Sequence, residues 1–573
     1  MTATPQVTEP AQSPAPMTHS EIVEALTGLL AAFFTAILSS TIVANALPTI
    51  MAELHGSQTD YAWVVTAALL ANAVTTPIWG KLADLFNKKV LVQISIVIFV
   101  AGSVMAGLAH AMPVLMTARV VQGIAMGGLT ALAQAIIGTI IPPRDRGRYS
   151  GYMGATMAVA TAGGPLLGGV IVDSPLGWRW TFFVCVPLAV IALILLQFKL
   201  KLSHIKRPAK IDWAGAALLS AGVSLLLIWV SFAGKPTYYD WISTTSALMV
   251  GGAIVLLAIL VWVESKVSAP IIPLKIISER TTALCILASV AVGVAMFAST
   301  TYIGQYYQVA RGETPTTAGL LTLPMIAGNL IGSVGSGQLI TRYGRWKRFL
   351  IGGTSLLIVG LGLAATIDHQ TALPIVCTYT LIFGLGLGML MQNLVLAVQN
   401  TVAAKDIGSA SGSVAFFRTV GGASGVAVLG AVMNNHVTTL IGEGLAKAGI
   451  KLPPGAGGGS SLDVKSMPEP IATIVRHAFG DGTALIFAIA AGFAAIALIA
   501  VLFIKEIPLR RTIDKVESAP VAAASLPETD RAAADLNEDA RVETARRNAQ
   551  RVAEETGARR AATDHLADTD PTD

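Results

Sequence analysis

The sequence predicts an all-α integral membrane protein with about fourteen transmembrane helices. Of its 573 residues, 53% are hydrophobic and 13% are charged, and the mean hydropathy is +0.66. A soluble protein carries about 25% charged residues. The charged residues of this chain fall between long apolar runs. Each run has roughly the 20 residues that a helix needs to cross about 30 Å of hydrocarbon.

The apolar runs define the expected spans. They lie at about 21–47, 61–81, 89–109, 113–141, 149–172, 179–199, 213–233, 244–263, 282–306, 317–341, 348–367, 373–398, 407–433 and 483–504. An even number of spans places both termini on the same side of the membrane.

Two short stretches between spans resemble each other. The first runs from Gly80 to Lys89 and the second from Gly337 to Arg348, and each is a small-residue turn followed by a cluster of cations. A duplicated basic hairpin is typical of a membrane protein with two homologous halves, and such proteins are usually transporters in which one half rocks against the other. The second and tenth spans end at these glycines, so spans 7 and 8 are predicted to be inserted between two six-helix halves.

This repeat gives the expected domain organisation, in which two six-helix halves flank an insertion. The expected parts are a disordered N-terminus (1–20), a six-helix half (21–200), a linker with two inserted helices (201–281), a second six-helix half (282–505) with an extracytoplasmic loop (434–482), and a polar tail (506–573).

The short loops predict the orientation, because cytoplasmic loops are enriched in Lys and Arg. Cations follow the even-numbered spans, at Lys81, Lys88, Lys89, Arg144, Arg146, Arg148, Lys199, Lys201, Lys206, Arg207, Lys210, Arg342, Arg345, Lys347 and Arg348. The loops after spans 1, 3 and 11 have none. We therefore expect both termini to be cytoplasmic and the protein to lie in the cell membrane as a multi-pass protein.

Several classes of function are excluded by the residue pattern. The net charge of +5 does not indicate a nucleic-acid partner, because the cations lie in short loops and form no stripe. Cys185, Cys285 and Cys377 are far apart and lack metal-ligand spacing. No nucleophile–base pair, metal set or phosphate loop is visible, so we expect no enzyme activity, no cofactor and no metal.

Seven motifs in order resemble the major facilitator superfamily, specifically its fourteen-span drug:proton antiporter branch. They are Leu38 to Pro48 in span 1, Gly80 to Lys89 after span 2, Arg119 to Gly123 in span 4, Gly164 to Gly169 in span 5, Trp178 to Pro187 at span 6, Tyr307 to Pro324 before span 10, and Phe416 to Gly425 in span 13. The resemblance implies a monomeric transporter in contact with membrane lipid, which exports a small-molecule substrate in exchange for protons.

The loop motif suggests a gate. A glycine at Gly80 permits a tight turn, and Asp84 is expected to pair with Arg144 or Arg148 in a neighbouring loop and so to clasp two rocking elements. Lys88 and Lys89 complete the motif. The alternative is that these cations only set the topology.

The span 5 motif comprises Gly164, Pro165, Gly168 and Gly169. The proline removes a backbone hydrogen bond and allows a kink, and the glycines permit close helix contact. Tight packing without a gating role is the alternative.

Two arginines within spans carry most of the information about the transport pathway. A cation at the bilayer centre costs at least about 2.5–3.5 kcal/mol, so it usually faces a cavity or a partner. Arg418 is about 16 Å into span 13 at 1.5 Å per residue, near the midplane. Arg119 is closer to the interface, where snorkelling is the alternative, and Gln122 lies on the same face.

Other polar residues within spans are candidates for the substrate or ion pathway, and each is also explained as a hydrogen-bonding contact between helices. They are Ser39, Asn45, Asn329, Gln392 and Asn393, with Gln134 as a further polar position.

The chain departs from the resembling branch at the site to which proton binding is attributed. The span 1 aspartate of that branch is Ser39 here, and a usual asparagine of span 6 is Cys185. Ser39 does not titrate, so the coupling ion stays open. The residue pattern and the resemblance together predict an exporter of amphipathic or lipophilic molecules, with proton coupling implied by the resemblance alone. A lipid or metabolite exporter is the alternative, and a non-transporting sensor or scaffold is a third interpretation.

Overall fold

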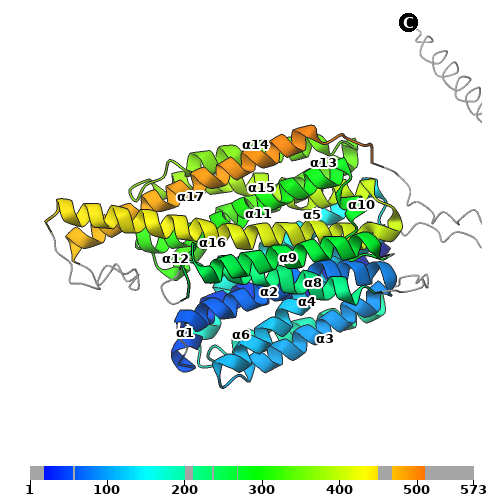
Figure 1. Ribbon diagram of the computed structural model, residues 1–573, viewed down its shortest axis with the longest axis horizontal. Coiled ribbons are helices and arrows are strands. Elements are labelled where there is room, and N and C mark those ends of the chain that lie inside the picture. Colours follow the sequence, from blue (N-terminus) through cyan, green and yellow to red (C-terminus); the bar gives the residue numbers. More distant parts are fainter. Residues whose placement is uncertain are drawn as a thin grey trace, which may run out of the picture. The chain divides into compact units, whose positions relative to one another are not determined.

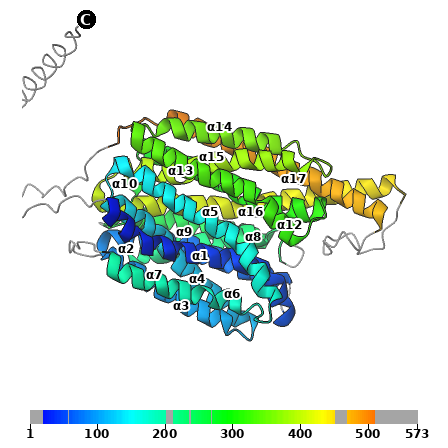
Figure 2. The ribbon, with the colours of Figure 1, turned by 180° about the vertical axis from the view of Figure 1, so that it is seen from behind.

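The structure is a computed structural model that describes residues 19–55, 58–200, 211–234, 238–267, 269–449 and 468–509. In these ranges the regular structure is helical, apart from one isolated bridge between Ala233 and Tyr239. Thirteen of the described helices are long and apolar enough to cross a membrane. One more long helix, α5 (Pro143–Asp173), has three arginines near its start and packs between α1 and α13 (Figure 2).

The helices follow the predicted order. The first half contains α1 (His19–Glu53), α2 (Gln58–Leu85), α3 (Lys88–Gly107), α4 (Met112–Ile140), α5, α6 (Trp180–Phe183) and α7 (Cys185–Lys199). Next come α8 (Trp213–Phe232), α9 (Thr244–Lys266) and the short α10 (Leu274–Ile277). The second half contains α11 (Arg280–Gln305), η1 (Tyr306–Ala310), α12 (Pro315–Leu321), α13 (Leu323–Tyr343), α14 (Lys347–Ala364), α15 (Leu373–Thr401), η2 (Ala404–Asp406), α16 (Ile407–Lys447) and α17 (Glu469–Phe503).

Polar residues at the helix ends set several of these boundaries. The Asn87 side chain accepts a hydrogen bond from Lys89 N at 3.0 Å and starts α3. Asp212 caps α8 in the same way through Gly215 N, and Ser243 caps α9 through Ser246 N. Gly344, with φ of 72°, ends α13 in the left-handed conformation that glycine adopts without steric cost.

The two halves lie on opposite sides of the inserted helices in Figure 1, where α11, α13, α14, α15 and α17 gather above and α1 to α4 gather below. The halves meet where α2 packs against α16 and where α5 packs against α13. By the predicted repeat, α13 corresponds to α2 and α16 corresponds to α5, so the two interfaces are equivalent. The inserted helices α8 and α9 pack on each other, and α8 also contacts both α2 and α16.

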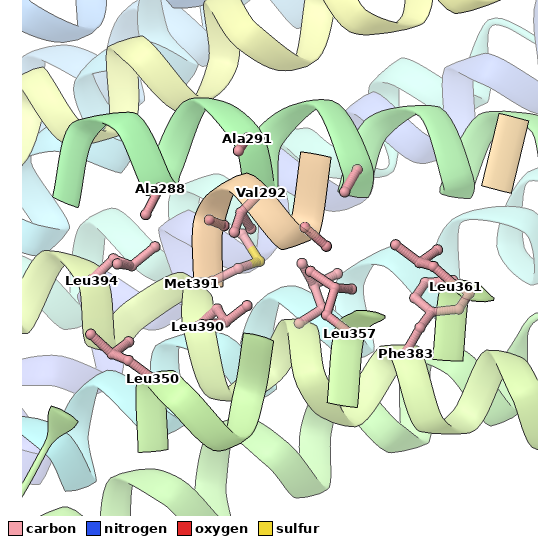
Figure 3. Close-up of a cluster of buried hydrophobic side chains, with 14 of the residues drawn as sticks. Ala288, Ala291, Val292, Leu350, Leu357, Leu361, Phe383, Leu390, Met391 and Leu394 are labelled. Carbon is pink, nitrogen blue, oxygen red and sulfur yellow. The ribbon is translucent and has the colours of Figure 1, made fainter. Parts of the chain in front are cut away.

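The second half has its own apolar core between α11, α14 and α15. Figure 3 shows Val292 of α11, Leu357 of α14 and Met391 of α15 pointing toward one another. Phe383 of α15 is fully buried beside Leu361. Many other apolar side chains, such as Leu248 and Trp262 on α9, are exposed, as expected for a surface that faces lipid.

Two expectations about the later part of the chain need correction. The loop expected at 434–482 is partly helical, because α16 continues to Lys447 and α17 starts at Glu469; its Gly- and Pro-rich middle lies outside the described residues.

The first residues of the polar tail are packed. The indole N–H of Trp346 donates to the carbonyl oxygen of Ile507 at 2.9 Å, and Glu506 accepts a hydrogen bond from Lys347 N at 3.1 Å.

Candidate functional site

The candidate site is a set of contacts between the halves at one end of the helices. We call this the basic end, because the loops carrying Lys81–Lys89, Arg144–Arg148 and Arg342–Arg348 lie there. The carboxylate of Asp84, from the end of α2, accepts hydrogen bonds from Gly408 N and Ser409 N, each at 2.8 Å, and from Ser409 Oγ at 2.5 Å. Gly408 and Ser409 belong to the first turn of α16. A helix N-terminus has unpaired N–H groups and a partial positive charge, so this is a favourable place for a carboxylate.

The close approach of α2 and α16 depends on two glycines. A Cβ built on Gly80 would lie 2.7 Å from the carbonyl oxygen of Gly408, a separation that real Cβ atoms do not tolerate. Glycine at both positions therefore allows Asp84 to reach the first turn of α16.

The equivalent interface between α13 and α5 has a similar construction. A Cβ built on Gly147 of α5 would lie 2.8 Å from the carbonyl oxygen of Gly337 of α13. Four residues after Gly337, the hydroxyl of Thr341 accepts a hydrogen bond from Arg148 N at 3.2 Å. Arg144 donates to the carbonyl oxygens of Thr341 and Arg342, each at 3.4 Å, at the negative end of α13.

A third contact at the basic end is made by Arg146, which is only 2% exposed. Its Nε donates to the carbonyl oxygen of Ile141 at 2.8 Å, its Nη2 donates to that of Gly138, and its Nη1 reaches the carbonyl oxygen of Gln399 of α15 at 3.3 Å. The amide of Gln399 in turn donates to the carbonyl oxygen of Gln134 at 3.1 Å and to Ser411 Oγ at 2.8 Å. Arg146 and Gln399 thus join α4, α5, α15 and α16.

The partners predicted for Asp84 are wrong. Arg144 donates to the end of α13 and Arg148 Nε donates to Tyr152 Oη, while Asp84 is bound by the start of α16. The physical reason is that a carboxylate binds to the peptide N–H groups at the start of a helix as favourably as it binds to a cationic side chain. Sequence reasoning also missed Ser409, which binds Asp84 through its backbone N–H and its hydroxyl, and Gln399, which donates to the carbonyl oxygen of Gln134 and to Ser411 Oγ.

The predicted arginine of span 4 is tied within the first half. Arg119 Nη1 donates to Gln122 Oε1 at 2.8 Å and its Nε approaches the carbonyl oxygen of Val64 at 3.4 Å. Gln122 Nε2 donates to Ser103 Oγ at 3.0 Å. This chain of hydrogen bonds links α4 to α2 and α3, and Arg119 is 4% exposed.

Arg418 lies in the second half, where α16 crosses α11 and α15. Its Nη1 donates to the carbonyl oxygen of Met391 at 3.2 Å, and a Cβ built on Gly293 of α11 would lie 3.2 Å from its Cγ. Arg418 is 7% exposed, and no ion pair joins it to a carboxylate in the described part of the chain. Buried positive charge is thus present in both halves.

Ser39 lies at the span 1 position where the resembling branch has an aspartate. It is 1% exposed and lies beside Cys185. On α5, the buried Gly164 packs against Thr41 of α1, whose hydroxyl donates to the carbonyl oxygen of Ala160 at 3.3 Å. Gly168 is buried in the same helix. The surroundings of Pro165 and Gly169 lie outside the description.

The remaining polar candidates do not form one cluster. Asn393 donates to Ser336 Oγ at 3.0 Å and to the carbonyl oxygen of Met389 at 2.7 Å, so it links α15 to α13. Gln392 is buried and faces α5, where a Cβ built on Gly154 would lie 3.7 Å from its Cγ. Asn329 of α13 is half-buried, and the side chain of Asn45 lies outside the description.

The opposite end carries polar contacts within each half. Arg179 donates to the carboxylate of Glu53, and its guanidinium holds the pKa of that carboxyl below the usual range; Trp178 Nε1 adds a hydrogen bond of 2.7 Å. A hydrogen bond from the Thr371 hydroxyl likewise lowers the pKa of Asp368. These contacts shape the loops and do not cross between the halves.

Two equivalent pairs of helices that join two halves of a multi-span helical protein define a membrane transporter built on an internal repeat. A family model described as Major Facilitator Superfamily matches residues 29–426. The chain belongs to this superfamily and is a transporter, not an enzyme.

The relatives and solved structures agree with this assignment. The chain is 36% identical to an uncharacterized MFS-type transporter of Mycobacterium tuberculosis over 84% of its own length and 69% of the relative's. It is 33% identical to the multidrug transporter protein MdtP of Bacillus subtilis (73% and 77%) and 31% identical to the efflux pump dotC of Dothistroma septosporum (87% and 86%).

Among solved structures, the fold is similar to the human organic anion transporter MFSD10, with a TM-score of 0.58 at 12% identity over 84% of this chain and 100% of that one. It is also similar to the proton:xylose symporter XylE, with a TM-score of 0.56 at 16% identity over 86% and 96%.

We predict that Asp84→Asn weakens the basic-end closure. Hydrogen bonds to a charged group contribute about 1.5–3 kcal/mol, so amide exchange at Gly408 and Ser409 should accelerate about 10- to 100-fold, and transport should fall at equal protein level. Hydrogen–deuterium exchange of the purified protein measures the first effect. Glu53→Gln, at the opposite end, is the matched control. If amide exchange at the start of α16 is unchanged, the Gly80–Lys89 motif has no role in closure and its cations only set the membrane orientation.

Proposed function

We propose that this protein exports amphipathic or lipophilic small molecules across the plasma membrane by alternating access, coupled to the proton gradient. The observation that carries the proposal is the closure of the basic end by contacts between the halves: Asp84 with Ser409, Arg148 with Thr341, and Arg146 with Gln399. These contacts are few and polar, so water can replace them when the halves separate. Relatives that are named an efflux pump and a multidrug transporter favour export as the direction.

In this proposal the basic end faces the cytoplasm, and the conformation described here corresponds to a transport state that is closed toward the cytoplasm. Cytoplasmic loops carry the excess of Lys and Arg, and both ends of the described chain belong to the basic end. Substrate then enters from the cytoplasm or the inner leaflet when the three contacts open, and the protein works as a monomer, since each copy contains both halves.

A second candidate function is export of lipids or metabolites without classical proton coupling. It is favoured by the charge of the core: Arg119 and Arg418 are buried without a carboxylate partner in the described part of the chain, and Ser39 replaces the usual acid. A positive core suits neutral or acidic molecules better than lipophilic cations.

Export is tested with several dyes of different charge in energised inverted membrane vesicles, with and without a protonophore. The proposal predicts dye accumulation that the protonophore abolishes. Vesicles that contain the Asp84→Asn protein at an equal level are the comparison, and they should accumulate less dye. Accumulation that survives the protonophore would support the second candidate, and no movement of any dye would count against drug export.

The orientation is tested by labelling single cysteines in a variant without Cys185, Cys285 and Cys377. In intact cells, a Ser460→Cys protein should react with an impermeant thiol reagent and an Ala533→Cys protein should not. The opposite pattern would invert the assigned orientation.

Arg418 is expected to bind an acidic or polar group of the substrate within the transport pathway. Arg418→Lys keeps the charge but loses the planar donor fork, and Arg418→Ala loses both. If the fork binds substrate, both variants should lose transport while remaining folded; if charge alone matters, Lys should restore most of the activity. A well-expressed Arg418→Ala protein that transports normally would leave the arginine as a structural anchor of α16 on α15.

A further inference from the structure

Two acidic residues are buried between the inserted helices, outside the site described above. Asp212 is the N-cap residue of α8 and is 7% exposed. Glu264 lies in the last turn of α9 and is 4% exposed. Because α8 starts and α9 ends at the basic end, the two carboxyl groups lie at the same level of the protein.

Each carboxyl group has one oxygen with partners and one without. Asp212 Oδ1 accepts from Gly215 N at 2.8 Å, and Glu264 Oε1 accepts from Ile271 N at 3.1 Å and Ile272 N at 3.3 Å. Asp212 Oδ2 and Glu264 Oε2 are buried and have no hydrogen-bond partner in the described part of the chain. A buried, unpaired polar atom costs about 1–3 kcal/mol, and more when it is charged.

The two carboxyl groups face the same small space. A Cβ built on Gly215 would press against Asp212 Oδ2 and would lie 3.0 Å from Glu264 Oε1. Glycine at this position keeps the space free for the acids. Two buried carboxylates this close repel each other, and one proton between them removes the repulsion and supplies the missing donor.

In the part of the chain that the structure describes, charged groups on the neighbouring elements do not replace that proton. Lys81 of α2 acts on Glu264 through its charge, but no ion pair forms between them among the described residues. Lys266, at the end of α9, and Lys275, on α10, are exposed to solvent. On the side of α16, which packs on α8, the residues that meet this helix pair include the apolar Phe416 and Phe417.

We propose that Asp212 and Glu264 form a proton-binding site that holds one shared proton while the basic end is closed. The proton comes from water and returns to it: one carboxylate becomes a carboxyl group, and its O–H donates to the unpaired oxygen of the other. The structural alternative is that both groups are ionised and serve only as caps.

The position of this site links it to the gate. Helix α8 contacts both α2 and α16, and Lys81 precedes Asp84 by three residues on α2. Loss of the proton creates a second negative charge beside Lys81 and so pulls on the segment that carries Asp84. This link rests on the proposed function, whereas the binding of the proton does not.

The binding is tested by infrared spectroscopy of the full-length protein in vesicles of an ether-linked phosphatidylcholine, which has no ester carbonyl group, without substrate. We expect the C=O stretching band of one protonated carboxyl group per chain at neutral pH, and we expect Asp212→Asn and Glu264→Gln each to abolish it. An amide N–H replaces the shared proton in both variants, which should therefore fold. Glu279→Gln is the control, since Glu279 is an exposed capping acid of α11.

Every outcome decides the proposal. A band that survives both amide variants, or is absent from the unmodified protein, would overturn it in favour of two ionised caps. Loss in Glu264→Gln alone would show a single protonated acid without sharing, and would also overturn it. Should the amide variants fail to fold, Asp212→Glu and Glu264→Asp must keep the band at shifted frequencies. Dye export in the same vesicles is scored separately, so a normal band without export would refute the proposed function and leave the proton site intact.

Discussion

The carboxylate of Asp84 caps a helix that belongs to the other half of the protein, and in the proposed mechanism the closed arrangement depends on this contact. The first turn of α16 has unpaired N–H groups, and its own N-cap residue, Asp406, makes no side-chain capping bond. Asp84 supplies acceptors to Gly408 N and Ser409 N only while α2 and α16 are together. Because the contact lies at an end of the bundle, water can take over its role on opening. The same exchange at the bilayer centre would leave the N–H groups without partners.

The internal repeat explains why closure involves two interfaces of the same construction. Gly80 and Gly337 begin equivalent hairpins, and the residues four positions later, Asp84 and Thr341, both accept from the start of a helix in the opposite half. The two contacts differ in charge. The carboxylate interacts with the helix dipole as well as with single N–H groups, whereas the hydroxyl of Thr341 accepts one bond. The α2–α16 interface is thus joined by a carboxylate, whereas the α5–α13 interface is joined by the Thr341 hydroxyl and by Arg144, which binds the carbonyl oxygens at the end of α13.

Much of the fold follows from the sequence, because apolar runs of spanning length and the repeated hairpins are properties of consecutive residues. The repeat predicted that the hairpins at Gly80 and Gly337 are equivalent, but not which helices meet there. The partner of Asp84 was not predictable, since Gly408 is 324 residues away and binds through its backbone, which leaves no charge pattern. Arg146 looked like one more topology cation for the same reason, because it donates to carbonyl oxygens of Ile141, Gln399 and Gly138. The helical extension of α16 beyond residue 433 was missed because its polar residues resemble a loop.

The distribution of buried charge constrains how this transporter can use a proton. Away from the basic end, the described core helices bury Arg119 and Arg418, and position 39 carries a serine hydroxyl that does not titrate. A carboxylate close to these arginines would stay ionised, since a nearby positive charge favours its charged form, and would bind protons poorly. A carboxyl pair at a distance from the arginines escapes this effect. Asp212 and Glu264 meet that condition, and α8 lies against a helix from each half. Movement of one half relative to the other therefore has to change the surroundings of α8, so a proton held there can respond to the conformation without lying in the substrate path.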